Sequence, residues 1–253
     1  MAAEVQKAEA QQGFDLLFYG DSITEHWRGT SMGAPDSTGP SIHDMWNKYF
    51  GSYNADVMAI AADQIEHLHW RLLNGEMPTV HPPRAAVVLI GTNDFEAAGR
   101  CGAGEQGMTA AADGVGDRLE RVLGLMRERM PATHIIIMAL LPRSYEQPGQ
   151  WPSQYSKGMM IVNDRMEALA SSDDQLHFID CNAAYLLPDG SMNVKLVPDG
   201  VHPNAEGHGL MAECLLPLIT QFVHPQPGGP VSEPDDAVQH DLKWQEVAKM
   251  LSL

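Results

Sequence analysis

The sequence contains short runs of consecutive apolar residues, each followed by a turn rich in glycine and small polar residues. Residues 16–19 and 85–90 are two such runs. A run of this length is too short for a helix, and its unbroken apolar character is typical of a strand covered on both faces of a parallel sheet. The runs therefore predict an α/β domain.

The segments between these runs carry apolar residues at helical spacing, as in Val115, Leu119, Val122 and Met126. The predicted strands are residues 15–19, 55–62, 85–90, 134–141 and 176–181, and the predicted helices are residues 3–12, 23–28, 42–50, 113–130, 155–170 and 205–222. Alternating strands and helices indicate a parallel five-stranded sheet with right-handed crossovers, which is a three-layer flavodoxin-like fold.

Local signals place a further helix and several loops. Asp63 is an N-cap residue type with Glu66 three positions later, so we expect a helix to begin there. Glycine, proline and small polar residues predict loops at residues 29–40, 91–94 and 99–107.

The composition narrows the classes of partner. A chain of 253 residues can bury one sizeable core. Its 33 acidic and 16 basic residues give a formal net charge of -17, which argues against nucleic acid and anionic membrane surfaces as partners. The acidic residues are spread along the chain, so they indicate a charged surface and identify no cationic substrate.

The cysteines and the N-terminus indicate a cellular location. Cys101, Cys181 and Cys214 are widely spaced and form no C-x-x-C pair, so the sequence predicts a reducing compartment without a disulfide or zinc framework. Residues 1–12 lack the apolar centre of a secretory signal, and no run reaches membrane-spanning length. We expect an intracellular, cytoplasmic protein that does not insert into membranes.

The composition changes near the C-terminus. We predict one domain over residues 1–224 and a proline- and glycine-rich linker from residue 225. Residues 242–253 could form a short amphipathic helix. This segment would pack on its own domain, or it would bind a protein partner or another copy of the chain.

Ser22 occupies the turn directly after the first predicted strand. Ligands of open parallel sheets bind at the carboxyl ends of the strands, so a hydroxyl at this position is well placed for chemistry. The segment 22–25 (Ser-Ile-Thr-Glu) also matches a capping box, in which Ser22 and Glu25 would only satisfy free N–H groups at a helix start. The turn by itself does not decide between the two interpretations.

A second polar turn precedes the last predicted helix. Asp199 and His202 lie three residues apart in a segment bounded by two prolines. A carboxylate so close to an imidazole can fix its tautomer, and the imidazole can then take a proton from a serine hydroxyl. The alternative is a turn that uses Asp, Gly, Pro and Asn only for their backbone geometry.

Three blocks together resemble the SGNH (GDSL) hydrolase superfamily. They are residues 20–25 (Gly-Asp-Ser-Ile-Thr-Glu), 91–94 (Gly-Thr-Asn-Asp) and 199–204 (Asp-Gly-Val-His-Pro-Asn), in the family's order and separation. The segments 62–76 and 140–143 (Leu-Leu-Pro-Arg) are most similar to the intracellular platelet-activating factor acetylhydrolase catalytic subunits. The resemblance extends over residues 14–222.

The resemblance implies a role for each matching residue. It makes Ser22 the nucleophile, His202 the general base and Asp199 the partner that orients the base. The oxyanion hole would consist of the backbone N–H of Ser22, the side-chain amide of Asn93 and the backbone N–H of Ala62. The family has glycine where this chain has Ala62, and a methyl group there would crowd the pocket or strain the turn.

These residues predict a serine esterase that hydrolyses a small acyl group, most simply acetyl, from a small-molecule ester without a cofactor or metal. The alternative is a non-catalytic scaffold or assembly subunit that retains the hydrolase fold. Trp27, Phe95 and Trp151 are candidates either for the pocket wall or for ordinary packing. His67 and His69 do not form a metal-binding motif.

Overall fold

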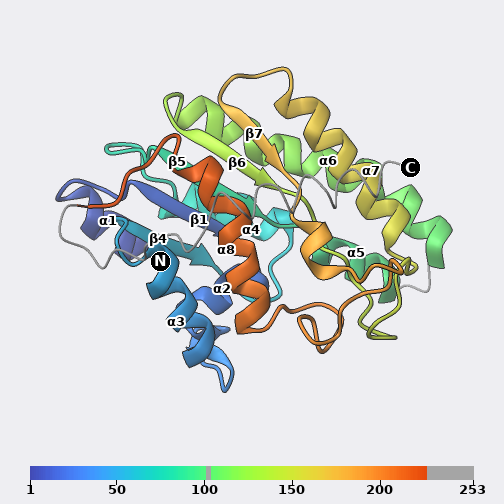
Figure 1. Cartoon of the computed structure of the whole chain (residues 1–253). Helices are drawn as coiled ribbons and strands as arrows, with labels where there is room; N and C mark the ends of the chain where they lie inside the picture. The colour runs from blue at the N-terminus through green and yellow to red at the C-terminus, as the bar shows by residue number, and fades with distance from the viewer. Residues whose placement is uncertain (101–103, 227–253) are drawn as a thin grey trace.

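A five-stranded parallel sheet forms the centre of the computed structural model, which describes residues 1–100 and 104–226 (Figure 1). The strand order is β4-β1-β5-β6-β7, which is the flavodoxin-like order. The strands are β1 (Leu16–Gly20), β4 (Ala55–Ala59), β5 (Ala85–Leu89), β6 (His134–Met138) and β7 (Leu176–Ile179). The predicted fold class, strand number and strand direction are therefore confirmed.

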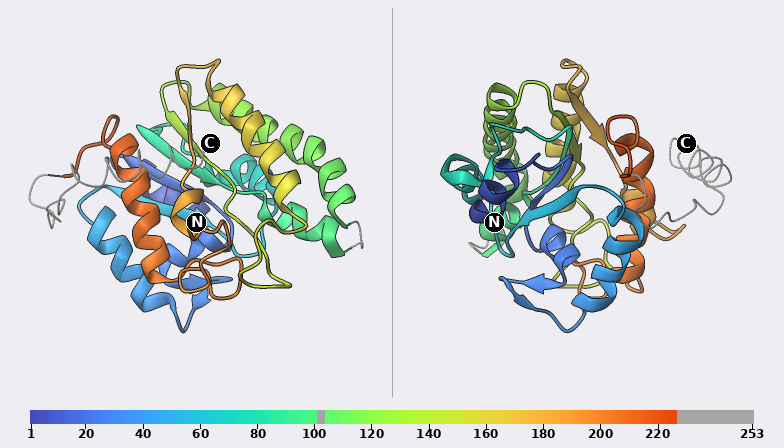
Figure 2. Two further views of the ribbon diagram at one scale, coloured as in Figure 1. Left: turned by 45° about the vertical axis from the view of Figure 1, so that its right-hand side comes forward. Right: turned by 90° about the vertical axis from the view of Figure 1, so that its left-hand side faces the viewer.

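Helices cover both faces of the sheet. The helical elements are α1 (Ala2–Glu9), α2 (Ser22–Glu25), η1 (His26–Arg28), α3 (Gly39–Phe50), α4 (Ile65–Arg71), η2 (Leu72–Glu76), α5 (Thr92–Arg100), α6 (Gly104–Arg129), α7 (Ser156–Ala170), η3 (Asn182–Tyr185) and α8 (Ala205–Ile219). Helices α3 and α8 pack together on one face, while α6 packs with α4, α5 and α7 on the other (Figure 2). The apolar runs of β1 and β5 are fully buried between these layers, as their composition predicts.

The strand order places a crevice at the carboxyl edge of the sheet, between β1 and β5. The chain leaves β1 toward β4 and leaves β5 toward β6, so the connections of these neighbouring strands diverge. Ligands of such sheets bind where the connections diverge. Gly20 ends β1 at this point, and a Cβ atom there would lie 2.5 Å from the carbonyl oxygen of Leu89 and 2.2 Å from Oγ1 of Thr24. Only glycine allows β1 and the turn after it to approach this closely.

Two of the predicted loops are wrong. Residues 91–94 and 99–107 mostly belong to α5 and α6, with residues 101–103 outside the described part. Gly99 serves close packing there, because a Cβ atom on it would lie 3.1 Å from the hydroxyl oxygen of Tyr155. The predicted loop at residues 29–40 contains a small ribbon of β2 (Thr30–Ser31) and β3 (Ala34–Pro35) before α3 begins.

The start of α4 also differs from the prediction. Gln64 is the N-cap, and its side chain and that of His67 exchange bonds with each other's backbone. Asp63 instead accepts a 2.7 Å hydrogen bond from Nε of Arg71, which is buried. The carboxylate of Asp63 therefore shares with Glu76 the neutralisation of a buried guanidinium, because both acids form ion pairs with Arg71.

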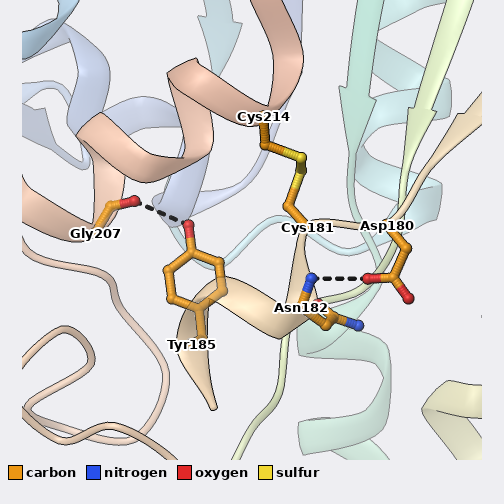
Figure 3. Close-up of a disulfide and its surroundings, with 6 residues drawn as sticks. All are labelled: Asp180, Cys181, Asn182, Tyr185, Gly207 and Cys214. Atoms are coloured by element: carbon orange, nitrogen blue, oxygen red, sulfur yellow. Dashed lines mark hydrogen bonds between the residues drawn. A yellow bond between two sulfur atoms is a disulfide. The ribbon is translucent and has the colours of Figure 1, made fainter. Parts of the chain in front are cut away.

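The prediction that the chain has no disulfide is wrong. Cys181, two residues after the end of β7, is bonded to Cys214 on α8 (Figure 3). Their 33-residue separation conceals the contact, because α8 returns beside the end of β7. Nearby, the hydroxyl of Tyr185 donates to the carbonyl oxygen of Gly207 at 2.9 Å. The cysteine argument for a reducing compartment therefore fails.

The described chain stays in contact with the domain through Gln226. Its backbone N–H donates to the carbonyl oxygen of Ser52 at 2.7 Å, and its side chain donates to Asp15 at 2.9 Å. This lies two residues beyond the predicted domain end at residue 224. The predicted amphipathic helix at residues 242–253 falls outside the described residues. Within residues 1–100 and 104–226, none of the helices has the length and apolar character needed to span a bilayer.

Candidate active site

The turn after β1 presents a serine hydroxyl. Asp21 is the N-cap of α2, and its Oδ1 accepts from the backbone N–H of Ile23 at 3.1 Å. Ser22 is the first residue of α2, and its Oγ lies 2.9 Å from Nε2 of His202. The capping-box interpretation of Ser22 is therefore wrong, since Asp21 caps the helix and leaves the serine hydroxyl for the histidine.

His202 is held by the loop before α8. Its Nδ1 lies 2.6 Å from Oδ2 of Asp199, while Oδ1 of Asp199 accepts from the backbone N–H groups of Val201 and His202 at 2.9 and 2.7 Å. Gly200 has a φ of 76°, and a Cβ atom there would lie 2.3 Å from the carbonyl oxygen of Ser144. Glycine thus allows the carboxylate and the imidazole to face each other across a tight turn.

The charge of Asp199 fixes the tautomer of the histidine. Burial raises the pKa of Asp199, but hydrogen bonds from the side chain and backbone of His202 outweigh this effect and lower it to about 2. An ionised carboxylate can only accept, so Nδ1 of His202 carries a proton. In the neutral ring, Nε2 then presents its lone pair to the hydroxyl of Ser22.

A buried histidine joins the serine turn to the helix that follows the base. His208, on α8, is fully buried, and its Nε2 lies 3.0 Å from the carbonyl oxygen of Ile23. Burial lowers its pKa to about 4, so the ring is neutral near pH 7. Its contact aligns the start of α8 with α2, and so helps to set the distance between Ser22 and His202.

The turn after β4 brings Ala62 to the same edge of the sheet. Ala62 has a φ of 68°, a left-handed conformation that favours glycine. The resemblance to the superfamily places a glycine at this position, and the backbone of Ala62 has the conformation that such a glycine would adopt. The preceding residue, Ala61, donates its N–H to Oε2 of Glu25 at 2.6 Å.

Asn93, at the start of α5, closes this side of the site. Its Nδ2 donates to the carbonyl oxygen of Asp63 at 2.9 Å, which leaves the second amide hydrogen for another acceptor. The neighbouring Asp94 accepts from the backbone N–H of Ile65 at 3.0 Å. These two bonds tie the turns after β4 and β5 together.

All five site residues predicted from the sequence line one cleft. The cleft has a volume of about 620 Å³ and contains Ser22, Ala62, Asn93, Asp199 and His202. Two charged residues on its wall, Arg143 and Glu96, form an ion pair at 2.7 Å.

The three aromatic candidates do not line this cleft. Trp27 and Phe95 are buried in the core, and Trp151 packs against it partly buried. Packing is therefore the role that the structure gives them.

The roles of Glu25 and His26 were not predicted from the sequence. Glu25 accepts from Thr30 Oγ1 and from the N–H groups of Met32, Gly33 and Ala61, so it holds the β2–β3 ribbon against the turn after β4. His26 lines the cleft beside His202. The position of Glu25 suggested only a capping role, and a single histidine in a helix carries no distinctive signal.

Comparison with known proteins identifies the family of this chain. The GDSL-like Lipase/Acylhydrolase family model matches residues 18–210. The chain belongs to this family. As a GDSL hydrolase it is a carboxylic ester hydrolase, and the sequence resemblance to the superfamily is confirmed.

Similar proteins include platelet-activating factor acetylhydrolase subunits. The chain is 25% identical over 213 residues to the human IB subunit alpha2, a match that covers 84% of this chain and 79% of that protein. It is 26% identical over 194 residues to the Bos taurus IB subunit alpha1, covering 76% and 75% of the two chains.

Solved structures share the fold. One described as a putative platelet activating factor from Streptococcus pneumonia matches with a TM-score of 0.64 and 18% identity, over 86% of this chain and 90% of that one. A catalytic mutant of an acetylxylan esterase from Geobacillus stearothermophilus matches with a TM-score of 0.57 and 20% identity, over 82% and 94%.

Proposed function

We propose that this GDSL hydrolase removes a small acyl group, most simply acetyl, from a small-molecule ester by acyl-enzyme chemistry on Ser22. The observation that carries the proposal is the hydrogen-bonded line from Ser22 Oγ through His202 to Asp199, with distances of 2.9 and 2.6 Å. A neutral imidazole oriented by a carboxylate can take the serine proton and so activate a weak nucleophile.

The residues of the cleft act one after another in the acylation step. Oγ of Ser22 attacks the ester carbonyl while its proton passes to Nε2 of His202. The carbonyl oxygen becomes an oxyanion, which the N–H groups of Ser22 and Ala62 and the side-chain amide of Asn93 stabilise. The intermediate collapses when His202 gives its proton to the departing alcohol oxygen.

Water completes the cycle. His202 takes a proton from a water molecule, which attacks the acyl-serine ester, and a second oxyanion forms against the same donors. His202 then returns the proton to Oγ of Ser22 as the acid leaves. Asp199 remains ionised throughout, and stabilises the imidazolium that forms in both halves of the reaction.

The acetyl assignment is supported by the position of Ala62, which lines the cleft. Its methyl group lies in the turn that carries a proposed oxyanion donor, where a larger acyl group would meet it. Two of the similar proteins are named for acetyl groups, an acetylhydrolase subunit and an acetylxylan esterase. Within the described residues, no feature favours the scaffold alternative over hydrolysis.

Labelling with a serine-directed fluorophosphonate tests the proposal. We expect the protein to be labelled at Ser22, and both Ser22→Ala and His202→Ala to prevent labelling and the hydrolysis of 4-nitrophenyl acetate. The Ser22→Ala variant should keep its thermal midpoint within a few degrees, because the change is small and local. Undiminished hydrolysis by Ser22→Ala would disprove the assignment.

A further inference from the structure

His26 is a second imidazole in the cleft, on the side of the general base. It begins η1, directly after α2, and its ring centroid lies 5.2 Å from that of His202. In the mechanism above, His202 gives its proton to the departing alcohol oxygen. The alcohol part of the ester must therefore lie on this side of the cleft, within reach of His26.

The surroundings of His26 determine the charge of its ring and which ring nitrogen is free to form a hydrogen bond. Burial lowers its pKa, and so does the nearby charge of His202, so the ring is neutral near pH 7. Nδ1 is buried and has no hydrogen-bond partner among residues 1–100 and 104–226. Nε2 has no partner in this part of the chain either and is not buried, and His26 lines the cleft, so Nε2 is the nitrogen that can face a substrate there.

The proton of the neutral ring belongs on Nε2. Placing it on Nδ1 would bury an N–H without an acceptor, which is rarer and costlier than an unused lone pair. The other tautomer presents an N–H donor to the cleft. His26 is therefore a neutral donor next to the position of the alcohol part of the substrate.

The adjoining wall of the cleft is rich in oxygen atoms. Ser31, Asp36 and Thr38 line it, and Oδ2 of Asp36 accepts from the backbone N–H of Thr38 at 3.3 Å. An ionised carboxylate offers further acceptor sites, so Asp36 can also bind a hydroxyl. Glu25 fixes this wall by accepting from Gly33 at 2.7 Å and Thr30 at 2.8 Å. Such a wall suits a group with several hydroxyls.

We propose that His26 determines specificity for the alcohol part of the ester, by donating from Nε2 to an oxygen of a neutral polyhydroxylated alcohol such as glycerol or a sugar. Asp36 accepts from a neighbouring hydroxyl of the same group. The carboxylates of Asp36 and Asp199 disfavour an anionic alcohol part. This inference rests on the proposed function of the cleft.

The test compares two substitutions of His26. In His26→Gln the amide nitrogen reaches about as far as Nε2 and keeps a donor, whereas His26→Phe keeps a flat ring without one. The substrates are glycerol monoacetate, 6-O-acetylglucose and 4-nitrophenyl acetate, whose aryl group has no hydroxyl.

We expect His26→Phe to lower kcat/KM for at least one polyol ester by roughly five- to thirtyfold, the usual range for losing a neutral hydrogen bond to substrate. The kcat/KM of His26→Gln for the polyol esters should stay within about threefold of that of the unsubstituted protein. For 4-nitrophenyl acetate, the kcat/KM of both variants should stay within the same range. The polyol ester that responds identifies the alcohol as glycerol or sugar. No loss on either polyol ester, or an equal loss on all three esters, would overturn the proposal.

Two controls separate this inference from its alternatives. If His26 acted only through His202, its removal would shift the pH dependence of 4-nitrophenyl acetate hydrolysis, whereas contact with the alcohol part leaves that profile unchanged. A shifted profile would therefore count against the proposal. Retained hydrolysis by Ser22→Ala would instead refute the proposed function itself, whatever the His26 variants do.

Discussion

Two turns at the carboxyl end of the sheet are built in different ways. The turn after β1 is capped from within, because Asp21 accepts from Ile23 two residues later. The turn after β4 is fixed from outside, by Glu25 through the N–H of Ala61 and by Asn93 through the carbonyl of Asp63. A turn held by distant side chains can keep a residue in a conformation that its own sequence disfavours.

Ala62 shows the consequence of this outside support. An L-residue in the left-handed region costs about 1–2 kcal/mol relative to the right-handed one. The φ of 68° at Ala62 therefore stores strain in the turn that carries a proposed oxyanion donor. Substitutions in the two turns and in the side chains that support them should separate local from outside support. We order them by their expected effect on turnover.

The largest effect should come from Asn93→Ala. This substitution removes a proposed oxyanion donor and also releases the carbonyl of Asp63. We expect kcat for 4-nitrophenyl acetate to fall by roughly a hundred- to a thousandfold, as for other single oxyanion donors. Steady-state kinetics would measure this, and a fall of less than tenfold would place the oxyanion elsewhere.

Glu25→Gln should have the next largest effect. The carboxylate accepts from four groups, and an amide can accept only through its one oxygen. We expect a loss of about 2 kcal/mol in the free energy of unfolding and a roughly ten- to fiftyfold lower kcat, because the Ala62 N–H shifts. Urea denaturation and kinetics would measure both. The exposed Glu105→Gln serves as the control, and equal behaviour of the two variants would show that Glu25 does not support the turn.

Ala62→Gly should have a smaller effect of the opposite sign. Glycine adopts this φ without strain and removes the methyl group, so we expect kcat on acetyl esters to rise by roughly three- to thirtyfold. The thermal midpoint should change little, because the relief of strain is offset by the greater entropy of glycine in the unfolded chain. An unchanged kcat would mean that the distant contacts already hold the Ala62 N–H in its best position.

Asp21→Asn should change stability more than turnover, because asparagine can still cap Ile23. Burial raises the pKa of Asp21 to about 7. An acid with a raised folded pKa stabilises the fold at low pH, and this contribution is lost as pH rises from about 4 to 7. The free energy of unfolding of the variant, relative to that of the unsubstituted protein, should therefore rise by about 1–3 kcal/mol from pH 4 to pH 8. Urea titrations at both pH values would measure this difference in stability, with the exposed Asp44→Asn as control. A difference that does not vary with pH would contradict the prediction.

The same contrast explains what could be predicted from the sequence. The strands were predictable because burial on both faces demands unbroken apolar runs, and the turns of Ser22 and His202 because local residues shape them. The support of the second turn was not, because Glu25 and Asn93 contact residues of that turn that lie 36 and 30 positions away in the chain. A carboxylate and an amide are ordinary on a helix, and only the folded arrangement shows what they bind.

The disulfide has the same non-local origin. Cysteine spacing along the chain gave no indication that the end of β7 and α8 are neighbours. The tautomer of His26 likewise depends on the absence of an acceptor around Nδ1 among the described residues, which a sequence pattern cannot show. Residue types at the site were therefore easier to predict than the contacts that set their chemistry.

The bond between Cys181 and Cys214 closes a covalent ring that contains Asp199 and His202 but not Ser22. A protease that cuts the exposed turn near Leu187 would divide the nucleophile and the base between two fragments. The ring would still join those fragments, so the nicked molecule would keep both halves of its catalytic apparatus. Reduction of the bond would turn the same nick into a separable break, with the serine on one polypeptide and the histidine on the other.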